Sequence, residues 1–231
     1  MKTAIITGGS GAIGGALVSE FSADYRVIFT YLNHSERAEE IAEKFGAEAV
    51  KCDQTNDIDI KKLSEISGSC DLLINNAGIG SVGLFTDISY FEMHNVINTD
   101  LLGAMSVTKS ILPLMIKKKS GCIINISSIW GIYGGSCEAV YSAAKAGIIG
   151  FTKALSKETG FSGIRVNCIA PGLIESEINS HLTNAEKSEF AEGTSLGRIG
   201  KPEDVAKAAR YLVEAEFVTG QILGVDGGFW G

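Results

Sequence analysis

The sequence has few of the residues that bind metals, build disulfide frameworks or separate domains. Its five cysteines include no Cys-x-x-Cys pair, so we expect reduced thiols packed inside a cytoplasmic protein. The three histidines are far apart and no His-Glu-x-x-His motif occurs, so we expect no metal site. The three prolines are scattered, and no low-complexity tract or repeat is present. We therefore expect residues 1–231 to form a single domain.

Positive charge and long apolar runs are also scarce. The formal net charge of −7 argues against a nucleic-acid partner, because affinity for a phosphate backbone comes from clustered Lys and Arg. The only basic run, 117–119, is either a patch for an acidic carrier protein or a solvated helix C-terminus, and we favour the second reading. No run of about 18 uncharged apolar residues and no signal-peptide pattern occur, so we expect neither a membrane span nor export.

The sequence does contain a regular alternation of short apolar runs and amphipathic segments. We predict strands at 3–7, 26–31, 47–52, 71–75, 121–127, 164–170 and 221–226. We predict helices near 12–22, 35–45, 56–67, 87–117, 138–160 and 202–214. Several strands are apolar on successive residues, as strands buried on both faces must be. The pattern predicts an α/β fold, a doubly wound parallel sheet (Rossmann fold) of about seven strands with helices on both faces.

A glycine-rich turn joins the first predicted strand to the first helix. Residues 7–14 read TGGSGAIG, in which Gly9, Gly11 and Gly14 satisfy Gly-x-Gly-x-x-Gly. Such a turn brings backbone amides at a helix N-terminus close to a pyrophosphate. A glycine-rich hairpin is the alternative, which the flanking strand and helix disfavour. The turn predicts a dinucleotide cofactor, with contacts from Gly8, Ser10, Gly11, Ile13 and Gly14.

The end of the second strand bears on the choice of cofactor. An Asp or Glu there would accept a hydrogen bond from the ribose 2′-hydroxyl of NADH. The residues at 31–35 are YLNHS, without a carboxylate, so we favour NADPH, with NADH as the alternative. Arg37 is the nearest arginine, but Glu36 lies beside it. Candidate contacts here are Asn33, His34 and Ser35, with Asp53 after the third strand placed near the adenine or serving an ordinary turn.

Three residues predict proton donation to a carbonyl group. Tyr141 and Lys145 are four residues apart on a predicted helix and so share one face. A tyrosine hydroxyl is a poor acid or base at neutral pH, and an adjacent ammonium is expected to lower its pKa. Ser128 ends a strand, where its hydroxyl can hold the substrate oxygen. The Tyr-x-x-x-Lys spacing also occurs by chance on many helices, so the argument rests on its conjunction with the glycine turn.

The chain resembles the short-chain dehydrogenase/reductases across essentially its full length. The matching stretches are TGGSGAIG (7–14), NNAG (75–78), INISS (124–128), YSAAK (141–145), RVNCIAPG (165–172) and VTGQILGVDGG (218–228). The resemblance implies Ser128, Tyr141 and Lys145 as catalytic residues, with Lys145 also bonding the nicotinamide ribose. It further implies cofactor contacts from Asn76, Ala77, Gly78, Pro171, Gly172, Ile174 and Ser176.

The chain departs from the family pattern at three positions. Ala12 replaces a glycine of the phosphate turn, and Gly11 stands where many NADPH-using members have Arg, which weakens the NADPH assignment. Asp100 stands where the family usually has an asparagine that helps to position a water in a proton relay. An aspartate can still accept hydrogen bonds from a water, and its charge is expected to act on Lys145. We therefore include Asp100 among the catalytic residues.

Within the family, the chain is most similar to 3-oxoacyl-acyl-carrier-protein reductases, which implies reduction of a ketone to a secondary alcohol and a role in fatty acid biosynthesis. The run SSIWGIYGGSCEAVYSAAK (127–145) is similar to bacterial elongation factor P 5-aminopentanone reductases, with Trp130 and 136–138 as the distinguishing residues. Those residues are alternatively packing at the rim of the site. A different class of function, a catalytically silent nicotinamide-sensing protein, is disfavoured by the intact Ser128, Tyr141 and Lys145 set.

Two further expectations concern the shape of the protein. The segment 173–200, which includes Glu175, Glu177, His181 and Gly193, is expected to form a mobile substrate lid. The resemblance also suggests a homotetramer, with the helices at 87–117 and 138–160 and the C-terminal GGFWG at its interfaces. A buried core would give the same apolar helix faces in the sequence.

Overall fold

Seven apolar segments pair into one parallel sheet in the computed structural model, which describes residues 1–176, 179 and 182–230. The strands are β1 (Lys2–Ile6), β2 (Tyr25–Tyr31), β3 (Glu48–Lys51), β4 (Leu72–Asn75), β5 (Gly121–Ile126), β6 (Ile164–Pro171) and β7 (Ile222–Val225). They lie in the order β3-β2-β1-β4-β5-β6-β7, and every neighbouring pair is parallel. The predicted doubly wound sheet is confirmed. Its order reverses direction between β1 and β4, where such sheets bind ligands.

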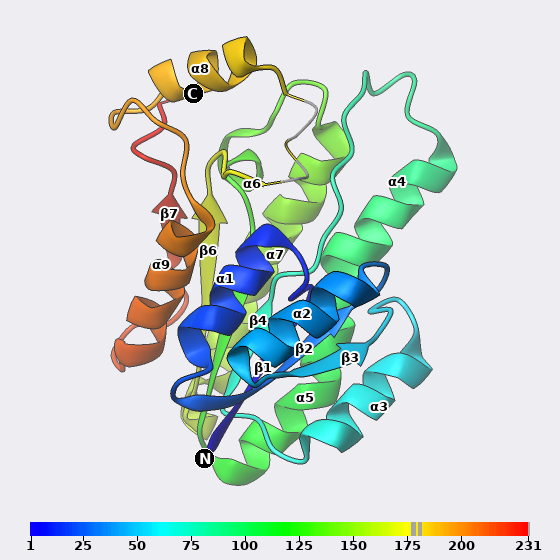
Figure 1. Ribbon diagram of the computed structural model, residues 1–231, viewed down its shortest axis with the longest axis vertical. Coiled ribbons are helices and arrows are strands. Elements are labelled where there is room, and N and C mark those ends of the chain that lie inside the picture. Colours follow the sequence, from blue (N-terminus) through cyan, green and yellow to red (C-terminus); the bar gives the residue numbers. More distant parts are fainter. Residues whose placement is uncertain (177–178, 180–181, 231) are drawn as a thin grey trace.

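Helices cover both faces of this sheet (Figure 1). They are α1 (Ala12–Phe21), α2 (Ser35–Phe45), α3 (Asp57–Ser67), α4 (Tyr90–Ile97), α5 (Ala104–Lys118), α6 (Trp130–Tyr133), α7 (Ala139–Thr159), α8 (Asn184–Glu192) and α9 (Pro202–Glu214), with a π-helical segment η1 (Asn98–Gly103) and a 3-10 turn η2 (Gly160–Ser162). One core layer joins the strands to α1, α2 and α9, and the other joins them to α3, α5 and α7.

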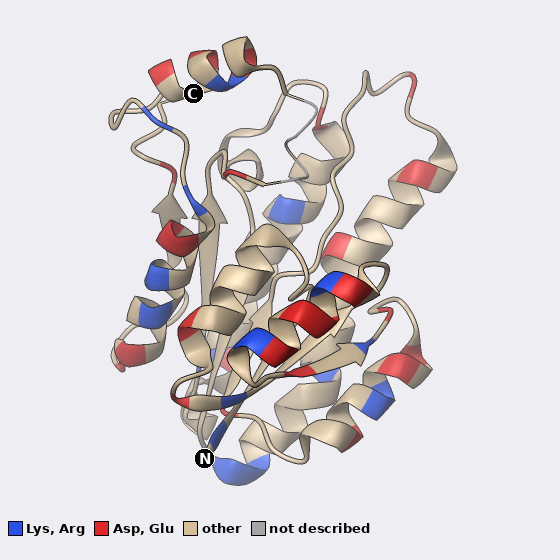
Figure 2. Ribbon diagram, in the orientation of Figure 1, with Lys and Arg blue, Asp and Glu red and all other residues tan. Residues whose placement is uncertain are grey.

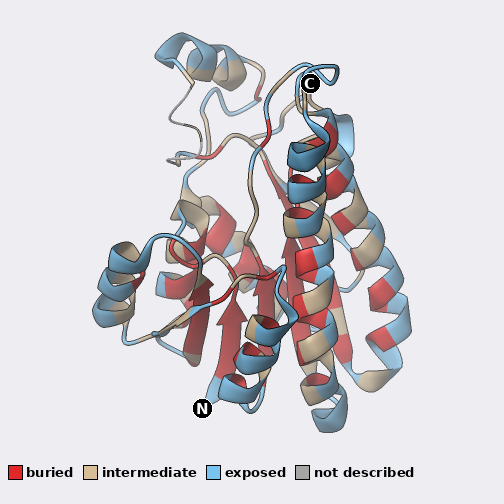
Figure 3. Cartoon of the chain, turned by 90° about the vertical axis from the view of Figure 1, so that its right-hand side faces the viewer, coloured by how far each residue is buried: buried red, intermediate tan, exposed pale blue. Residues whose placement is uncertain are grey.

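The strands are apolar on successive residues because each side faces a helix layer. On β1, Ile5 belongs to the layer of α3, α5 and α7, whereas Ala4 and Ile6 belong to the layer of α1, α2 and α9. All three side chains are fully buried. Figure 3 shows the buried strands between partly exposed helices. A parallel sheet covered on both sides requires this pattern, and the burial holds the carboxyl ends of the strands in fixed positions.

Most predicted boundaries agree with the structure to within one residue, but the helix predicted at 87–117 is divided. It begins with α4, is interrupted by the π-helical η1 and continues as α5. Ser89 caps α4 by accepting a hydrogen bond from the Glu92 amide at 3.1 Å. The short α6, and α8 within the predicted lid, were not predicted. Glu177 and His181 of the predicted lid, and Gly231 at the predicted interface, lie outside the described residues.

Charged side chains lie mainly on the outer helices α2, α3 and α9, while the strands are largely uncharged (Figure 2). By length and composition alone, the helical stretch Tyr90–Lys118 is apolar enough to cross a membrane. Its inward face packs in the core through Val107, Ile111 and Met115, all fully buried. A core helix of this kind passes the same test, so the stretch is weak evidence for a membrane span.

Candidate active site

The glycine turn between β1 and α1 leaves its helix N-terminus uncovered. Gly14 approaches the turn so closely that an added Cβ would lie 2.7 Å from Gly9 Cα. A Cβ on Gly11 would meet only Gly8 O, at 3.5 Å, so the space above Gly11 is open. No side chain caps α1, and its first turn contains no acidic residue. Open amides at a helix N-terminus suit an anion, so the turn fits a dinucleotide pyrophosphate.

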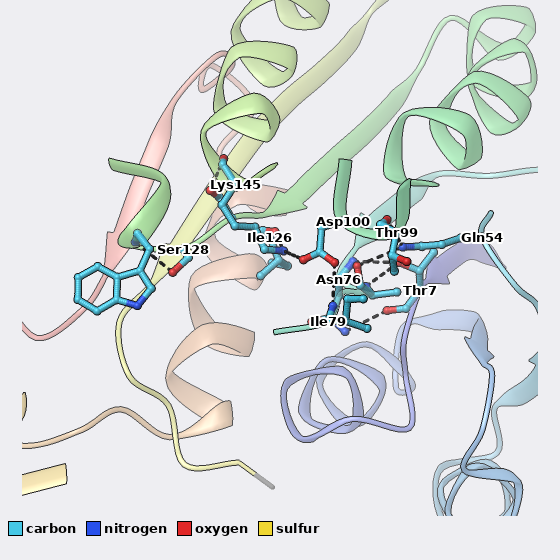
Figure 4. A network of polar contacts seen from close by, with 12 residues as sticks. Thr7, Gln54, Asn76, Ile79, Thr99, Asp100, Ile126, Ser128 and Lys145 are labelled. Atoms are coloured by element: carbon cyan, nitrogen blue, oxygen red, sulfur yellow. Dashed lines mark hydrogen bonds and ion pairs between the residues drawn. The ribbon is translucent and has the colours of Figure 1, made fainter. Parts of the chain in front are cut away.

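Hydrogen bonds tie this turn to the end of β4. The Thr7 hydroxyl accepts from the amides of Asn76, at 2.9 Å, and Ala77, at 3.0 Å. The Asn76 side-chain amide donates to Thr7 O at 3.0 Å and to Gly8 O at 3.2 Å. Figure 4 shows Thr7 and Asn76 within this network. Asn76 therefore uses its side chain to hold the turn that faces the cofactor site.

The residues predicted to contact the adenine and its ribose lie at the ends of β2 and β3. Asn33, His34 and Ser35 are exposed between β2 and α2. Arg37 lines a groove between α1 and α2 together with Ala12, which places it beside the phosphate turn. The Asp53 carboxylate accepts hydrogen bonds from the Thr55 amide at 2.8 Å and the Thr55 hydroxyl at 2.7 Å. This is the ordinary turn that we gave as the alternative to an adenine contact.

The end of β6 lies across the same edge of the sheet. Pro171 O accepts from the Ile129 amide at 2.9 Å, and Gly172 N donates to Val225 O at 3.0 Å. Ile174 is buried and pairs with Gly200 as an isolated bridge. Ser176, half-buried, follows immediately. These contacts fix the segment predicted to face the nicotinamide and close the base of the predicted lid.

Two neighbouring elements bring the three predicted catalytic residues together. Tyr141 and Lys145 lie one turn apart on α7, with Lys145 Nζ 5.4 Å from the centre of the Tyr141 ring. Ser128 follows β5 and is 8% exposed; its hydroxyl accepts from the Trp130 amide at 3.1 Å. Ser127 fixes β5 against α7 by donating to Lys145 O at 2.8 Å. The site thus places two hydroxyl groups and an ammonium at one end of the sheet.

Asp100 joins this group from η1. Its Oδ2 lies 3.1 Å from Lys145 Nζ, and both side chains are almost fully buried. Asp100 Oδ1 accepts from the Ile79 amide at 2.8 Å. Lys145 Nζ also donates to Ile126 O at 3.4 Å. Figure 4 shows the Lys145 chain reaching from α7 to the Asp100 carboxylate. The lysine predicted to be catalytic is therefore half of a buried ion pair.

The structure corrects the expected direction of the tyrosine pKa. Burial raises the pKa of Tyr141 above its ordinary value; the Lys145 charge and the Ser128 side chain lower it, whereas Asp100 and Glu138 raise it further. The net shift is upward, because burial and two carboxylates outweigh one ammonium. Burial alone would lower the pKa of Lys145, but Asp100 and Tyr141 raise it to about 12. At neutral pH the site therefore holds a protonated tyrosine beside a charged lysine.

An aromatic cluster stands at the rim of the site. Phe190 of α8 stacks on Phe229 with ring centres 5.0 Å apart, and Trp130 meets Phe229 edge-on at 5.7 Å. Tyr133 contacts Phe229 at 5.9 Å. This cluster, residues Trp130, Tyr133, Phe190 and Phe229, links the predicted lid to the C-terminal segment and to the loop after Ser128. Only Trp130 was singled out in the sequence, since rings so far apart along the chain carry no common pattern.

Of the five cysteines, only Cys168 lies near the predicted catalytic residues. Cys52, Cys70 and Cys122 are buried, and burial raises their pKa to about 11, 12 and 11, which leaves unreactive thiols. Cys168 is buried near Lys145, and burial raises its pKa to about 12. Cys137 is exposed in a left-handed turn before α7. Among the described residues, no group of three or more His, Cys, Asp and Glu is placed to hold a metal.

Sequence reasoning did not identify Gln54 and gave no role to Asn75 and Asn125, which lie within the matching stretches NNAG and INISS; these residues hold the site from behind. Gln54 Nε2 donates to Thr99 O at 2.8 Å and to Ala77 O at 3.3 Å, which connects η1 to the cofactor edge. Asn75 donates to Asn125 Oδ1 at 2.8 Å across β4 and β5. Polar residues at buried strand ends are the signal that could have found the two asparagines. Gln54 carries no such signal, because it lies in a loop.

Comparisons with known proteins agree with this geometry. A family model described as enoyl-(acyl carrier protein) reductase matches residues 9–230. A 3-oxoacyl-[acyl-carrier-protein] reductase of Chlamydia trachomatis is 40% identical, covering 98% of this chain and 96% of that protein. An uncharacterized oxidoreductase of Bacillus subtilis, YmfI, is 38% identical over 99% of this chain and 98% of its own length. The 3-oxoacyl-[acyl-carrier-protein] reductase of Thermotoga maritima is 34% identical, with 98% and 97% covered.

Proposed function

The chain belongs to the short-chain dehydrogenase/reductase family, and from this premise we propose that it is a 3-oxoacyl-acyl-carrier-protein reductase of fatty acid biosynthesis. The reaction is the nicotinamide-dependent reduction of the 3-ketone to a secondary alcohol. One observation carries the proposal: a protonated tyrosine, an orienting serine and a charged lysine lie together beside a glycine turn that suits a dinucleotide. Relatives bearing this activity in their names match nearly the whole chain.

The residues divide the work of protonating the ketone oxygen. A nicotinamide bound at the glycine turn would supply the hydride to the ketone carbon. The Ser128 hydroxyl orients the ketone oxygen, and the Tyr141 hydroxyl donates the proton to it as the alcohol forms. The raised pKa of Tyr141 keeps this proton in place at neutral pH, as a reductase requires. Lys145 holds an ammonium beside Tyr141 and stabilises the phenolate left after the proton has moved.

We propose NADPH as the cofactor. The end of β2 presents Asn33, His34 and Ser35, none of which would repel a 2′-phosphate. Arg37 lines the groove beside the phosphate turn and is the cation best placed on that side. Glu36 and the absence of an arginine at Gly11 keep NADH as the competitor.

The strand end offers a direct test of cofactor choice. In Asn33→Asp a new carboxylate would repel the 2′-phosphate and accept from the ribose 2′-hydroxyl of NADH. We expect the KM for NADPH to rise roughly tenfold or more, while the KM for NADH falls. Steady-state kinetics with both cofactors measures the change. Gln221→Glu, which adds the same charge at the start of β7, is the control; equal effects of both variants would refute the assignment.

The activity itself is tested by following nicotinamide absorbance with acetoacetyl-acyl-carrier protein and NADPH. We expect rapid oxidation of NADPH with this substrate and none with the 2-enoyl thioester of the same length. The Ser128 side chain and the Tyr141 hydroxyl lie together, where they can bind the oxygen on the carbon that is reduced, and the reduced carbons of an enoyl group carry no oxygen. Exclusive turnover of the enoyl thioester would contradict the proposal and favour the activity in the description of the family model.

A second candidate substrate is the 5-aminopentanone group on a lysine of elongation factor P. Glu138, just before α7, acts on the Tyr141 hydroxyl, and its amide donates to Gly135 O at 3.2 Å, where a Cβ on Gly135 would meet the Trp130 ring. A carboxylate and aromatic rings suit the ammonium that this group carries. Offering the modified protein in parallel with the thioester decides between the two: turnover of the modified protein alone would replace our first proposal. Oxidation of NADPH with neither substrate would instead favour a cofactor-sensing protein.

We also propose that the enzyme acts in the cytoplasm, as a homotetramer, with 173–200 forming a lid over the substrate. The described part of this segment is attached at both ends: Glu175 N donates to Gly200 O at 2.9 Å, and Leu196 N donates to Gly227 O at 3.0 Å. Between these attachments α8 contributes only Phe190 to the aromatic cluster. A segment fixed at its base and lightly packed at its tip suits a lid.

A further inference from the structure

Asp100 and Lys145 form an ion pair whose two side chains are almost completely buried. The Asp100 side chain is 0% exposed and the Lys145 side chain 5% exposed, at an N–O distance of 3.1 Å. A buried charge is costly unless it is paired and hydrogen-bonded. The other groups that face the lysine are Ile126 O at 3.4 Å, the Tyr141 ring and the Cys168 thiol, and the carboxylate is the one that pairs with it as an ion. The carboxylate therefore balances the charge of the lysine at this depth.

The backbone around Asp100 is arranged to hold the pair. Asp100 lies in the π-helical η1, an interruption of regular helix that often marks a functional site. The Ile79 amide donates to Asp100 Oδ1 at 2.8 Å, which leaves Oδ2 directed at the lysine. A Cβ on Gly78 would lie 2.6 Å from Asp100 Oδ2 and 3.2 Å from Lys145 Nζ. Gly78 thus leaves the space that the ion pair fills.

We propose that Asp100 is a positioning residue that fixes the Lys145 ammonium and balances its charge, so that Tyr141 keeps its proton, and with it the ability to reduce ketones, into alkaline solution. The inference rests on the proposed function for its consequence in catalysis. Asp100 acts through Lys145 and does not itself exchange a proton with substrate. A neutral residue of the same shape would leave the ammonium uncompensated beside Tyr141.

Few other ionisable groups act on this tyrosine. Glu138, at the start of α7, raises the pKa of Tyr141 in the same sense as Asp100. The Cys168 thiol on β6 faces Lys145. From α4, which packs against α7, Glu92 turns to Ser81 Oγ at 3.1 Å. Asp100 is distinguished from Glu138 because it is the one that pairs directly with the lysine.

The sign of the effect follows from charge. The Asp100 carboxylate raises the pKa of Tyr141, because a negative charge nearby disfavours the phenolate; removing it while Lys145 stays charged should therefore lower that pKa. A charge within about 4–6 Å shifts a pKa by one to three units, and Asp100 acts on Tyr141 from beyond Lys145, so we expect a fall of about one unit. The rate of ketone reduction by the variant should therefore begin to decrease at a pH about one unit lower than in the unchanged chain.

The test is a spectroscopic titration of tyrosinate in the cofactor-free protein, for Asp100→Asn and the unchanged chain. The same titration of each protein carrying Tyr141→Phe assigns the band of Tyr141 among the six tyrosines. We expect the midpoint of Tyr141 to fall by about one pH unit in Asp100→Asn; an unchanged or higher midpoint would overturn the proposal. If Asp100→Asn does not fold, Asp100→Ser, which is also neutral, replaces it in the titration. We expect the same fall in the midpoint of Tyr141.

Asp71→Asn is the matched control. Asp71 also accepts from a backbone amide, Thr3 N at 2.8 Å, and pairs with a lysine, Lys118, but before β4 and away from Tyr141. It should leave the midpoint unchanged, and a fall equal to that of Asp100→Asn would overturn the proposal. Because the titration needs no substrate, it remains decisive if the proposed ketone substrate is wrong. The pH dependence of kcat/KM then tests the catalytic consequence separately.

Discussion

Gly78 is the residue at which the architecture of the site tolerates least change. Its hypothetical Cβ would lie 2.6 Å from Asp100 Oδ2, and the carboxylate and the lysine beside it are both almost fully buried. We expect Gly78→Ala to lower kcat about tenfold to a hundredfold, because displacing a catalytic group by about 1 Å has effects of this size. Steady-state kinetics measures it.

Gly83→Ala is the matched control for this change. Its Cβ would meet only Ile88 Cγ1, at 3.7 Å, an ordinary contact, and its backbone does not have a positive φ. We expect kcat to remain within about twofold of the unchanged chain, as for most surface substitutions. Full activity of Gly78→Ala would mean that the ion pair can move without affecting the reaction.

The sequence predicted which residues meet at the site better than it predicted their electrostatics. Ser128, Tyr141 and Lys145 were found because their spacing matches a strand end and one helical turn. The upward shift of the Tyr141 pKa was not, because it depends on burial and on Asp100, which is far away in sequence and reaches Lys145 only through η1. The spacing of Tyr141 and Lys145 alone therefore predicted a lowered pKa for the tyrosine.

At the scale of elements, the aromatic cluster connects α8 to the C-terminal segment. The Phe190 and Phe229 rings stack nearly parallel, and Trp130 closes one side. Loss of an aromatic pair costs about 0.5–1.5 kcal/mol beyond area burial. We expect Phe229→Ala to raise the rate of limited proteolysis within α8 about two- to tenfold and to raise the KM for the ketone.

Phe217→Ala is the control for the loss of a phenylalanine, since Phe217 is fully exposed after α9. It should leave both the proteolysis rate and the KM unchanged. If Phe229→Ala behaves in the same way, the cluster does not hold the lid.

The positions of the regular helices and strands could be predicted because the spacing of apolar residues along the sequence indicates them. The strands of the buried sheet and α7 carry that pattern along their whole length. The division of the helix at 87–117 was not predicted, since the π-helical η1, NTDLLG, contains no proline and has a glycine only at its end. The helix α8 within the proposed lid has no buried residue, so its sequence shows no apolar face; its visible signal is the capping box of Thr183 and Glu186.

At the scale of the whole molecule, one apolar face is left uncovered by the part of the chain that the structure describes. Tyr90 and Phe91 of α4 are 81% and 82% exposed, and Leu102 and Met105 continue the exposed face into α5. We expect light scattering to give a mass four times that of the 24.4 kDa chain. Phe91→Glu should reduce that mass, because a charge would be buried at an apolar contact; a monomeric unchanged chain would contradict the proposed homotetramer.

The account depends most directly on the Tyr141 hydroxyl as the proton donor. Single-turnover reduction of acetoacetyl-acyl-carrier protein by NADPH should slow about a hundredfold or more in Tyr141→Phe, as for loss of a general acid. The dissociation constant of NADPH, measured by fluorescence, should change little, because the ring and Lys145 remain. Turnover retained at the rate of the unchanged chain would contradict the account, because phenylalanine has no hydroxyl proton to donate.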